Sequence, residues 1–211
     1  MPIPFIIADA FAVDNLIIGL AAFAIAVTIN AEAQGFVANL LRYDEVAQDK
    51  RFFSFNPLAH LDPFALAAFL FCGFGWPRRV LPSLAARSLR HRLAIQLAGP
   101  VANLLLANII GSIMLILGKM NAELLDEKAI NAVMVTNVAF GIYNLLLPLP
   151  PLAMGNLAGR LVTPVKKETA TYIAGLLVLF SLLLFEFVTG RVVLSGILND
   201  ITRTVFLFMK P

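Results

Sequence analysis

The stretch Thr28-Ile29-Asn30-Ala31-Glu32-Ala33-Gln34-Gly35 decides the fold of this 211-residue chain, because it places polar side chains near the end of a long apolar segment. That segment runs from Asp14 to Leu41 and carries no charge from Leu16 to Ile29. About 20 apolar helical residues cross the ~30 Å hydrocarbon core of a bilayer, so the segment is long enough to span a membrane. Polar side chains are costly in hydrocarbon, so we expect this cluster to face the interior of a helical bundle.

The composition extends this expectation to the whole chain. Hydrophobic residues make up 60% and charged residues 14%, a balance that a water-soluble surface does not tolerate. Residues 93–118, 129–148 and 169–187 are also long and apolar enough to cross a membrane. A fifth segment, residues 192–209, is interrupted by polar side chains, so it either spans or lies along the interface. We expect an all-α integral membrane protein, a polytopic helical bundle of four to six spans in one domain of residues 1–211.

Local features refine the expected bundle. The apolar run 64–76 is too short to cross comfortably and ends among glycines and a proline, so it is expected to form a short re-entrant or surface element. Pro100 lacks the N–H that a helix interior uses, so a kink is expected there. Asn103 and Asn108 are expected to bridge helices by hydrogen bonds.

Lys and Arg residues are concentrated in two parts of the chain, whose net charge is +3. Residues 42–92 hold eight of them and residues 156–168 hold three. Cytoplasmic loops are enriched in Lys and Arg, so both parts are expected in the cytoplasm and the acidic loop 119–128 outside. This topology accounts for the basic residues, so we expect contacts with membrane lipid and none with nucleic acid.

The polar cluster has two faces. Asn30 and Gln34 are four residues apart and therefore share one face of a helix. Glu32 is rotated by about 200° from Asn30, so it points away from that pair. Together with Asn144, these three residues are the candidate binding residues.

Several motifs follow one another along the chain. They are Asn-Pro-Leu-Ala-His-Leu-Asp-Pro at 56–63, Gly-Phe-Gly-Trp at 73–76, Leu-Ala-Gly-Pro-Val-Ala-Asn at 97–103 and Pro-Leu-Pro-Pro-Leu at 148–152. In order and spacing the series resembles the short bacterial subfamily of site-2-protease-like intramembrane zinc metalloproteases. The resemblance covers roughly residues 29–160.

The resemblance implies a site-2-protease-like core at about residues 14–160, followed by C-terminal helices at about 169–209. It also implies a location in the bacterial cytoplasmic (inner) membrane. His60, inside the first motif, would have a structural role as a hydrogen-bonded histidine rather than as a metal ligand.

The family's catalytic residues would fall on four positions of this chain. Its H-E-x-x-H motif, with two zinc ligands and a general base, would fall on Asn30, Ala31 and Gln34, and its third ligand, an Asp, on Ala153. None of the four residues matches the family, and amides are poor zinc ligands. We therefore expect no catalytic residue, no metal and no cofactor, and a chain that is not an enzyme.

These observations favour a catalytically inactive site-2-protease-like protein, a pseudoprotease, that acts as a binding, scaffold or structural subunit of a membrane protein complex. Its expected partners are other integral membrane proteins. Two alternatives stay open: an active intramembrane metalloprotease with displaced ligands, and a small membrane transport element that uses Glu32.

Overall fold

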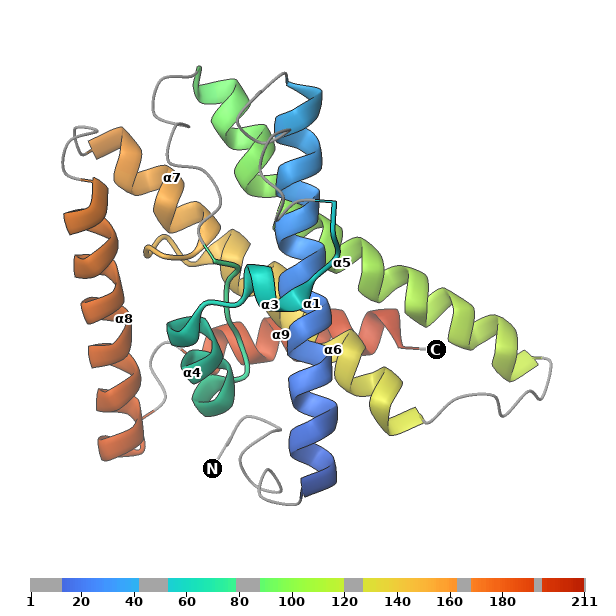
Figure 1. The fold of residues 1–211 in the computed structure, drawn as a ribbon. Coiled ribbons are helices and arrows are strands. Elements are labelled where there is room, and N and C mark those ends of the chain that lie inside the picture. Colours follow the sequence, from blue (N-terminus) through green and yellow to red (C-terminus); the bar gives the residue numbers. More distant parts are fainter. Residues whose placement is uncertain are drawn as a thin grey trace.

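The computed structural model of the chain describes residues 13–41, 53–78, 88–119, 127–162, 168–191 and 195–210, and these form helices and short connections without a strand (Figure 1). In chain order the helices are α1 (Val13–Leu40), α3 (Pro57–His60), α4 (Pro63–Cys72), α5 (Leu89–Lys119), α6 (Glu127–Leu146), α7 (Ala153–Val162), α8 (Glu168–Thr189) and α9 (Ser195–Met209).

Four of these helices are long and apolar enough to cross a membrane. They cover Asp14–Leu40, Leu89–Gly118, Glu127–Leu146 and Ala170–Thr189, and they correspond to the four clear segments of the sequence. The prediction of a polytopic helical membrane protein is therefore confirmed, and the protein is integral to the membrane.

Helices α1, α5 and α6 pack on one another and form the centre of the bundle. Small residues allow this close packing. A Cβ atom added at Gly99 of α5 would lie 2.6 Å from Asn30 Cγ, and one added at Gly141 of α6 would lie 2.6 Å from Leu104 Cδ2. Helix α5 continues through Pro100 as a single helix and changes direction along its length (Figure 1). The prolyl ring thus bends the helix without ending it.

Helix α4 is the short element expected between the first two spans. Its ten residues rise only about 15 Å, and Asp62 caps its first turn by accepting hydrogen bonds from the N–H groups of Phe64 and Ala65. On its buried side, Phe69 contacts Phe23 of α1 with the ring centroids 4.7 Å apart. This helix is therefore fixed to α1 by aromatic packing, and its depth in the membrane remains a prediction.

Helix α9 lies in the fifth apolar segment, which was expected either to span the membrane or to lie along the interface. It has 15 residues, which rise about 22 Å and fall short of the ~30 Å hydrocarbon core. Instead of standing alone it packs on α6, where Tyr143 Oη donates a hydrogen bond to Asn199 Oδ1 at 2.8 Å. The described part of the fifth segment is therefore a short helix attached to the bundle, and it is shorter than a full span.

Candidate functional site

A chain of four buried carboxamides joins the three central helices. Gln34 Nε2 donates to Asn30 Oδ1 at 2.8 Å, Asn30 Nδ2 donates to Asn103 Oδ1 at 2.6 Å, and Asn103 Nδ2 donates to Asn137 Oδ1 at 2.8 Å. The first two residues lie on α1, Asn103 on α5 and Asn137 on α6. We call these four residues the amide cluster. Asn30, Asn103 and Asn137 are fully buried, and Gln34 is 7% exposed.

Backbone carbonyls complete the hydrogen bonding of the amide cluster. Asn103 Nδ2 also donates to the carbonyl of Ala26 at 2.9 Å, and Asn137 Nδ2 donates to that of Val133 at 2.8 Å. An amide without a partner costs about 2 to 7 kcal/mol in an apolar environment. The amide cluster avoids that cost and makes Asn103 the point at which α1, α5 and α6 are tied together.

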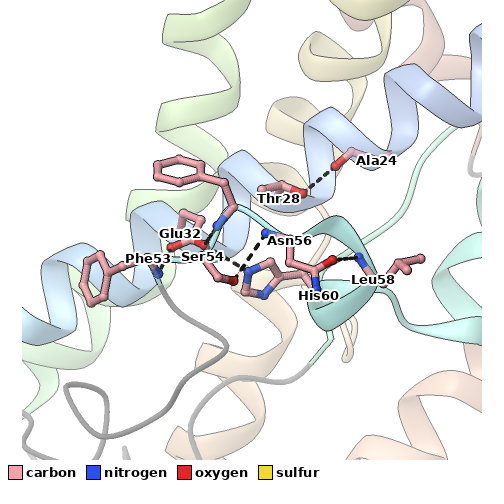
Figure 2. A network of polar contacts seen from close by, with 9 residues as sticks. Ala24, Thr28, Glu32, Phe53, Ser54, Asn56, Leu58 and His60 are labelled. Carbon is pink, nitrogen blue, oxygen red and sulfur yellow. Dashed lines mark hydrogen bonds and ion pairs between the residues drawn. The ribbon is translucent and has the colours of Figure 1, made fainter.

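The Glu32 carboxylate is rotated by about 200° from Asn30 around α1. It binds a different segment, which begins at Phe53 (Figure 2). Its Oε2 accepts a hydrogen bond from the N–H of Phe53 at 2.6 Å, and its Oε1 accepts one from the N–H of Phe55 at 2.9 Å. His60 Nε2 lies 3.2 Å from the same Oε1. Both Glu32 and His60 are buried, at 6% and 1% exposure, so the carboxylate is satisfied within the chain.

The segment that Glu32 holds has an unusual backbone. Phe53 and Phe55 have φ angles of 60° and 50°, in the left-handed region that residues other than glycine seldom adopt. This conformation directs both N–H groups at one carboxylate while the two side chains remain exposed. We infer from these contacts that Glu32 positions residues 53–60 against α1.

Asn144 ties two further parts of the chain to α6. Its Nδ2 donates to the carbonyls of Gly75 and Phe140, both at 2.9 Å, and its Oδ1 accepts the N–H of Ala153 at 3.2 Å. One fully packed side chain therefore fixes both the connection after α4 and the first residue of α7. Asn144 is 1% exposed, so it is a structural contact and not an open binding group.

The four positions expected from the resemblance lie on two helices, three of them on α1 and Ala153 at the start of α7. Asn30 and Gln34 meet in the amide cluster, and the neighbouring Ala31 is fully buried on α1. Ala153 is 4% exposed and is held by Asn144 of α6. Within the part of the chain that the structure describes, Asn30 and Gln34 are joined directly, and Ala153 is joined to α6.

The donor set does not fit a zinc ion. Catalytic zinc needs three protein ligands from His, Cys, Asp or Glu and an open position for water. Within the described ranges no three such residues lie close enough to hold a metal. The Asn30 amide oxygen already accepts a hydrogen bond from Gln34. The residues that the structure describes at this site are arranged for hydrogen bonding between helices.

Sequence reasoning found part of this arrangement. Asn103 was expected to bridge helices and does so, whereas Asn108 is exposed and lies outside the amide cluster. The link between Asn103 and Asn30 was missed. The spacing of Gly99 and Asn103 could have indicated this link. The two residues are four apart and therefore share one face of α5. Gly99 leaves room for the Asn30 side chain, and Asn103 binds it.

A second missed contact joins α8 to the segment before α4. Tyr172 Oη donates a hydrogen bond to Asp62 Oδ2 at 3.1 Å, while Asp62 Oδ1 caps α4. The rings of Phe64 and Phe180 reinforce this contact at a centroid distance of 6.3 Å. No pattern in the sequence pairs residues 110 positions apart, so only the fold reveals this contact.

The fold and site define a polytopic helical membrane protein whose central helices are joined by buried amides. The chain is 31% identical over 165 residues to the Bacillus subtilis protein named "Putative zinc metalloprotease YwhC", and the match covers 74% of each chain. No family model matches the sequence, and no solved structure matches it. On this relationship the chain belongs to the site-2-protease-like family of membrane zinc metalloproteases.

The same comparison corrects one expectation from the sequence. The chain was expected not to be an enzyme, because the H-E-x-x-H residues and the third ligand were not found at Asn30, Ala31, Gln34 and Ala153. The relative is named as a zinc metalloprotease, and this points to protease activity. The prediction failed because it rested on four positions of the chain, whereas the similarity to the relative extends over 74% of the chain.

Proposed function

We propose that this metalloprotease-family membrane protein acts by binding another integral membrane protein, as a scaffold or structural subunit of a complex in the bacterial cytoplasmic membrane. The observation that carries the proposal is the amide cluster. At the two positions where the resemblance places zinc ligands, Asn30 and Gln34 bond to each other and to Asn103. These bonds support a fixed helical framework.

The other anchors of the fold support the same proposal. Glu32 holds residues 53–60 against α1, and Asn144 holds the connection at Gly75 and the start of α7. Each of these buried polar groups is used to fix one segment against another. Such a framework offers a partner helix a preorganised surface, and this lowers the entropic cost of binding.

Purification of the full chain from its native membranes in a mild detergent tests the proposal. We expect the 22.9 kDa chain to migrate as part of a larger complex with another integral membrane protein in fixed stoichiometry. Asn103→Leu, which breaks the amide cluster, should reduce recovery of that partner, and Asn108→Leu on the exposed face should not. A wild-type chain that migrates without a second protein would contradict the proposal.

Zinc-dependent cleavage of a membrane segment is a second candidate function, and the name of the relative favours it. The described His, Cys, Asp and Glu residues form no three-ligand group, so this function needs ligands from other parts of the chain. Zinc analysis after chelator washing separates the two candidates. About one retained zinc per chain, together with cleavage of a bound partner, would favour the protease.

The transport alternative has less support from the site. A carboxylate that carries ions needs free coordination, and Glu32 accepts hydrogen bonds from the N–H groups of Phe53 and Phe55. An ion flux through reconstituted protein that disappears in Glu32→Gln would restore this alternative.

A further inference from the structure

Helix α9 runs along a membrane-spanning helix between two points of attachment. Near its start, Asn199 binds Tyr143 of α6, and just beyond its end Lys210 Nζ lies 3.3 Å from Glu127 Oε1. Glu127 begins the span of α6, and Tyr143 lies 16 residues later, about 24 Å along that helix. Figure 1 shows α9 crossing α1 at a level between the two ends of α1 and of α8. A bilayer spanned by these helices would therefore enclose α9.

The outer face of α9 carries two opposite charges. Asp200 and Arg203 are both exposed and are one helical turn apart. Between the described residues, neither side chain forms an ion pair. Exposed apolar residues flank them on the same helix, with Ile197 at 70% and Leu207 at 57% exposure. Charges on a membrane-embedded surface are costly unless they are paired, so a partner that neutralises both would stabilise this face.

We propose that the partner is a second copy of this chain, bound through α9 in an antiparallel pair. When two α9 helices are related by a two-fold axis that passes between residues 200 and 203, Asp200 of each copy faces Arg203 of the other. The same arrangement brings Ile197 of one copy to within one residue, about 1.5 Å along the helix axis, of the level of Leu207 of the other. A two-fold interface requires a surface that is complementary to itself, and two opposite charges one turn apart meet that requirement.

The pairing is independent of the proposed function, because it concerns the purified chain alone. It is tested with two differently tagged copies of the full chain, co-expressed and purified in lipid nanodiscs. Wild-type copies should purify together. Asp200→Arg expressed with itself, or Arg203→Asp with itself, places like charges across the axis and should reduce co-purification at least about tenfold.

The decisive sample is the mixed pair. Asp200→Arg in one copy and Arg203→Asp in the other restores opposite charges at both contacts, so co-purification should return to the wild-type level. Recovery in the mixed pair also excludes misfolding of the single variants. Arg191→Asp, which changes an exposed charge outside α9, is the matched control and should have no effect.

Three outcomes would overturn the proposal. These are a wild-type chain that stays monomeric, single variants that associate as well as wild type, and a mixed pair that fails to recover although each variant keeps the wild-type thermal unfolding temperature. The first outcome would leave the face in contact with lipid or with a different protein.

Discussion

Asn103 shows how a single residue can hold a membrane bundle together. Its side chain accepts one hydrogen bond and donates two, and the partners lie on both α1 and α6. In a membrane, apolar side chains gain little by leaving lipid for one another, so packing and hydrogen bonds between helices carry more of the stability. Single substitutions in the amide cluster are therefore expected to change the stability of the protein.

We predict that Asn103→Leu destabilises the protein by about 2 to 4 kcal/mol, because three hydrogen bonds between helices are lost and Asn30 keeps a buried amide without its acceptor. Reversible unfolding in detergent measures the effect. Asn108→Leu on the exposed face of the same helix should change stability by less than about 0.5 kcal/mol. Equal effects of the two substitutions would show that the amide cluster has no special role.

At Glu32, we predict that substitution by Gln releases residues 53–60. A neutral amide has one acceptor oxygen in place of two, so the N–H of either Phe53 or Phe55 loses its partner. Hydrogen exchange at these two amides should accelerate about tenfold, which corresponds to one lost hydrogen bond of roughly 1.4 kcal/mol. Unchanged protection at both amides would exclude the anchoring role, and exchange in α6 provides the internal reference.

At the scale of the elements, the approach of α5 to α1 depends on one glycine. The contact is so close that a Cβ atom at Gly99 would overlap the Asn30 side chain. Farther along the same helix, a Cβ atom at Gly118 would meet no atom within 4 Å. Substitution of Gly99 by alanine therefore tests the packing of α5 on α1, and the same substitution at Gly118 tests helix propensity alone.

We predict that Gly99→Ala destabilises the bundle by about 1 to 3 kcal/mol, because α5 must move away from α1 and the bond between Asn30 and Asn103 must lengthen. Gly118→Ala should change stability by less than about 1 kcal/mol, with alanine the better helix former. Thermal unfolding in the same detergent provides the comparison. A neutral Gly99→Ala would mean that the helices meet less closely than the structure shows.

At the scale of the whole molecule, the charges predict the orientation of the protein in the membrane. The spans of α1, α5, α6 and α8 are identified by their length and composition, and the direction in which they cross is a prediction from the Lys and Arg residues. Residues 79–87 and 120–126, which carry much of this prediction, lie outside the described residues. An experiment on intact cells is therefore the direct test.

We predict that a cysteine at position 126 is labelled from outside the cell and that a cysteine at position 87 is not, both on a Cys72→Ala background. The eight Lys and Arg residues between residues 42 and 92 should retain their loop in the cytoplasm. Labelling by a membrane-impermeant maleimide measures whether each cysteine is accessible from outside the cell. Permeabilised cells serve as the control for the reactivity of each cysteine. Labelling at 87 with protection at 126 would reverse the topology.

The sequence alone determined the class of fold and the family relationship. The lengths of the apolar segments set the four spans, because a helix rises a fixed distance per residue and must match the hydrocarbon thickness. Helical periodicity also separated Glu32 from Asn30 and Gln34. The series of motifs pointed to the site-2-protease-like family, and the relationship to the Bacillus subtilis protein supports that family. The inference from missing ligands to a missing activity was wrong.

Only the tertiary structure decided which helix each polar face meets. Periodicity shows that Asn30 and Gln34 share a face, but it cannot show that this face meets Asn103, 73 residues away. It likewise could not show that Glu32 binds the backbone of Phe53 and Phe55, or that α9 attaches to α6 at Tyr143. Such contacts depend on how close two helices approach, and this closeness is set by packing around small residues such as Gly99, which no local pattern reveals.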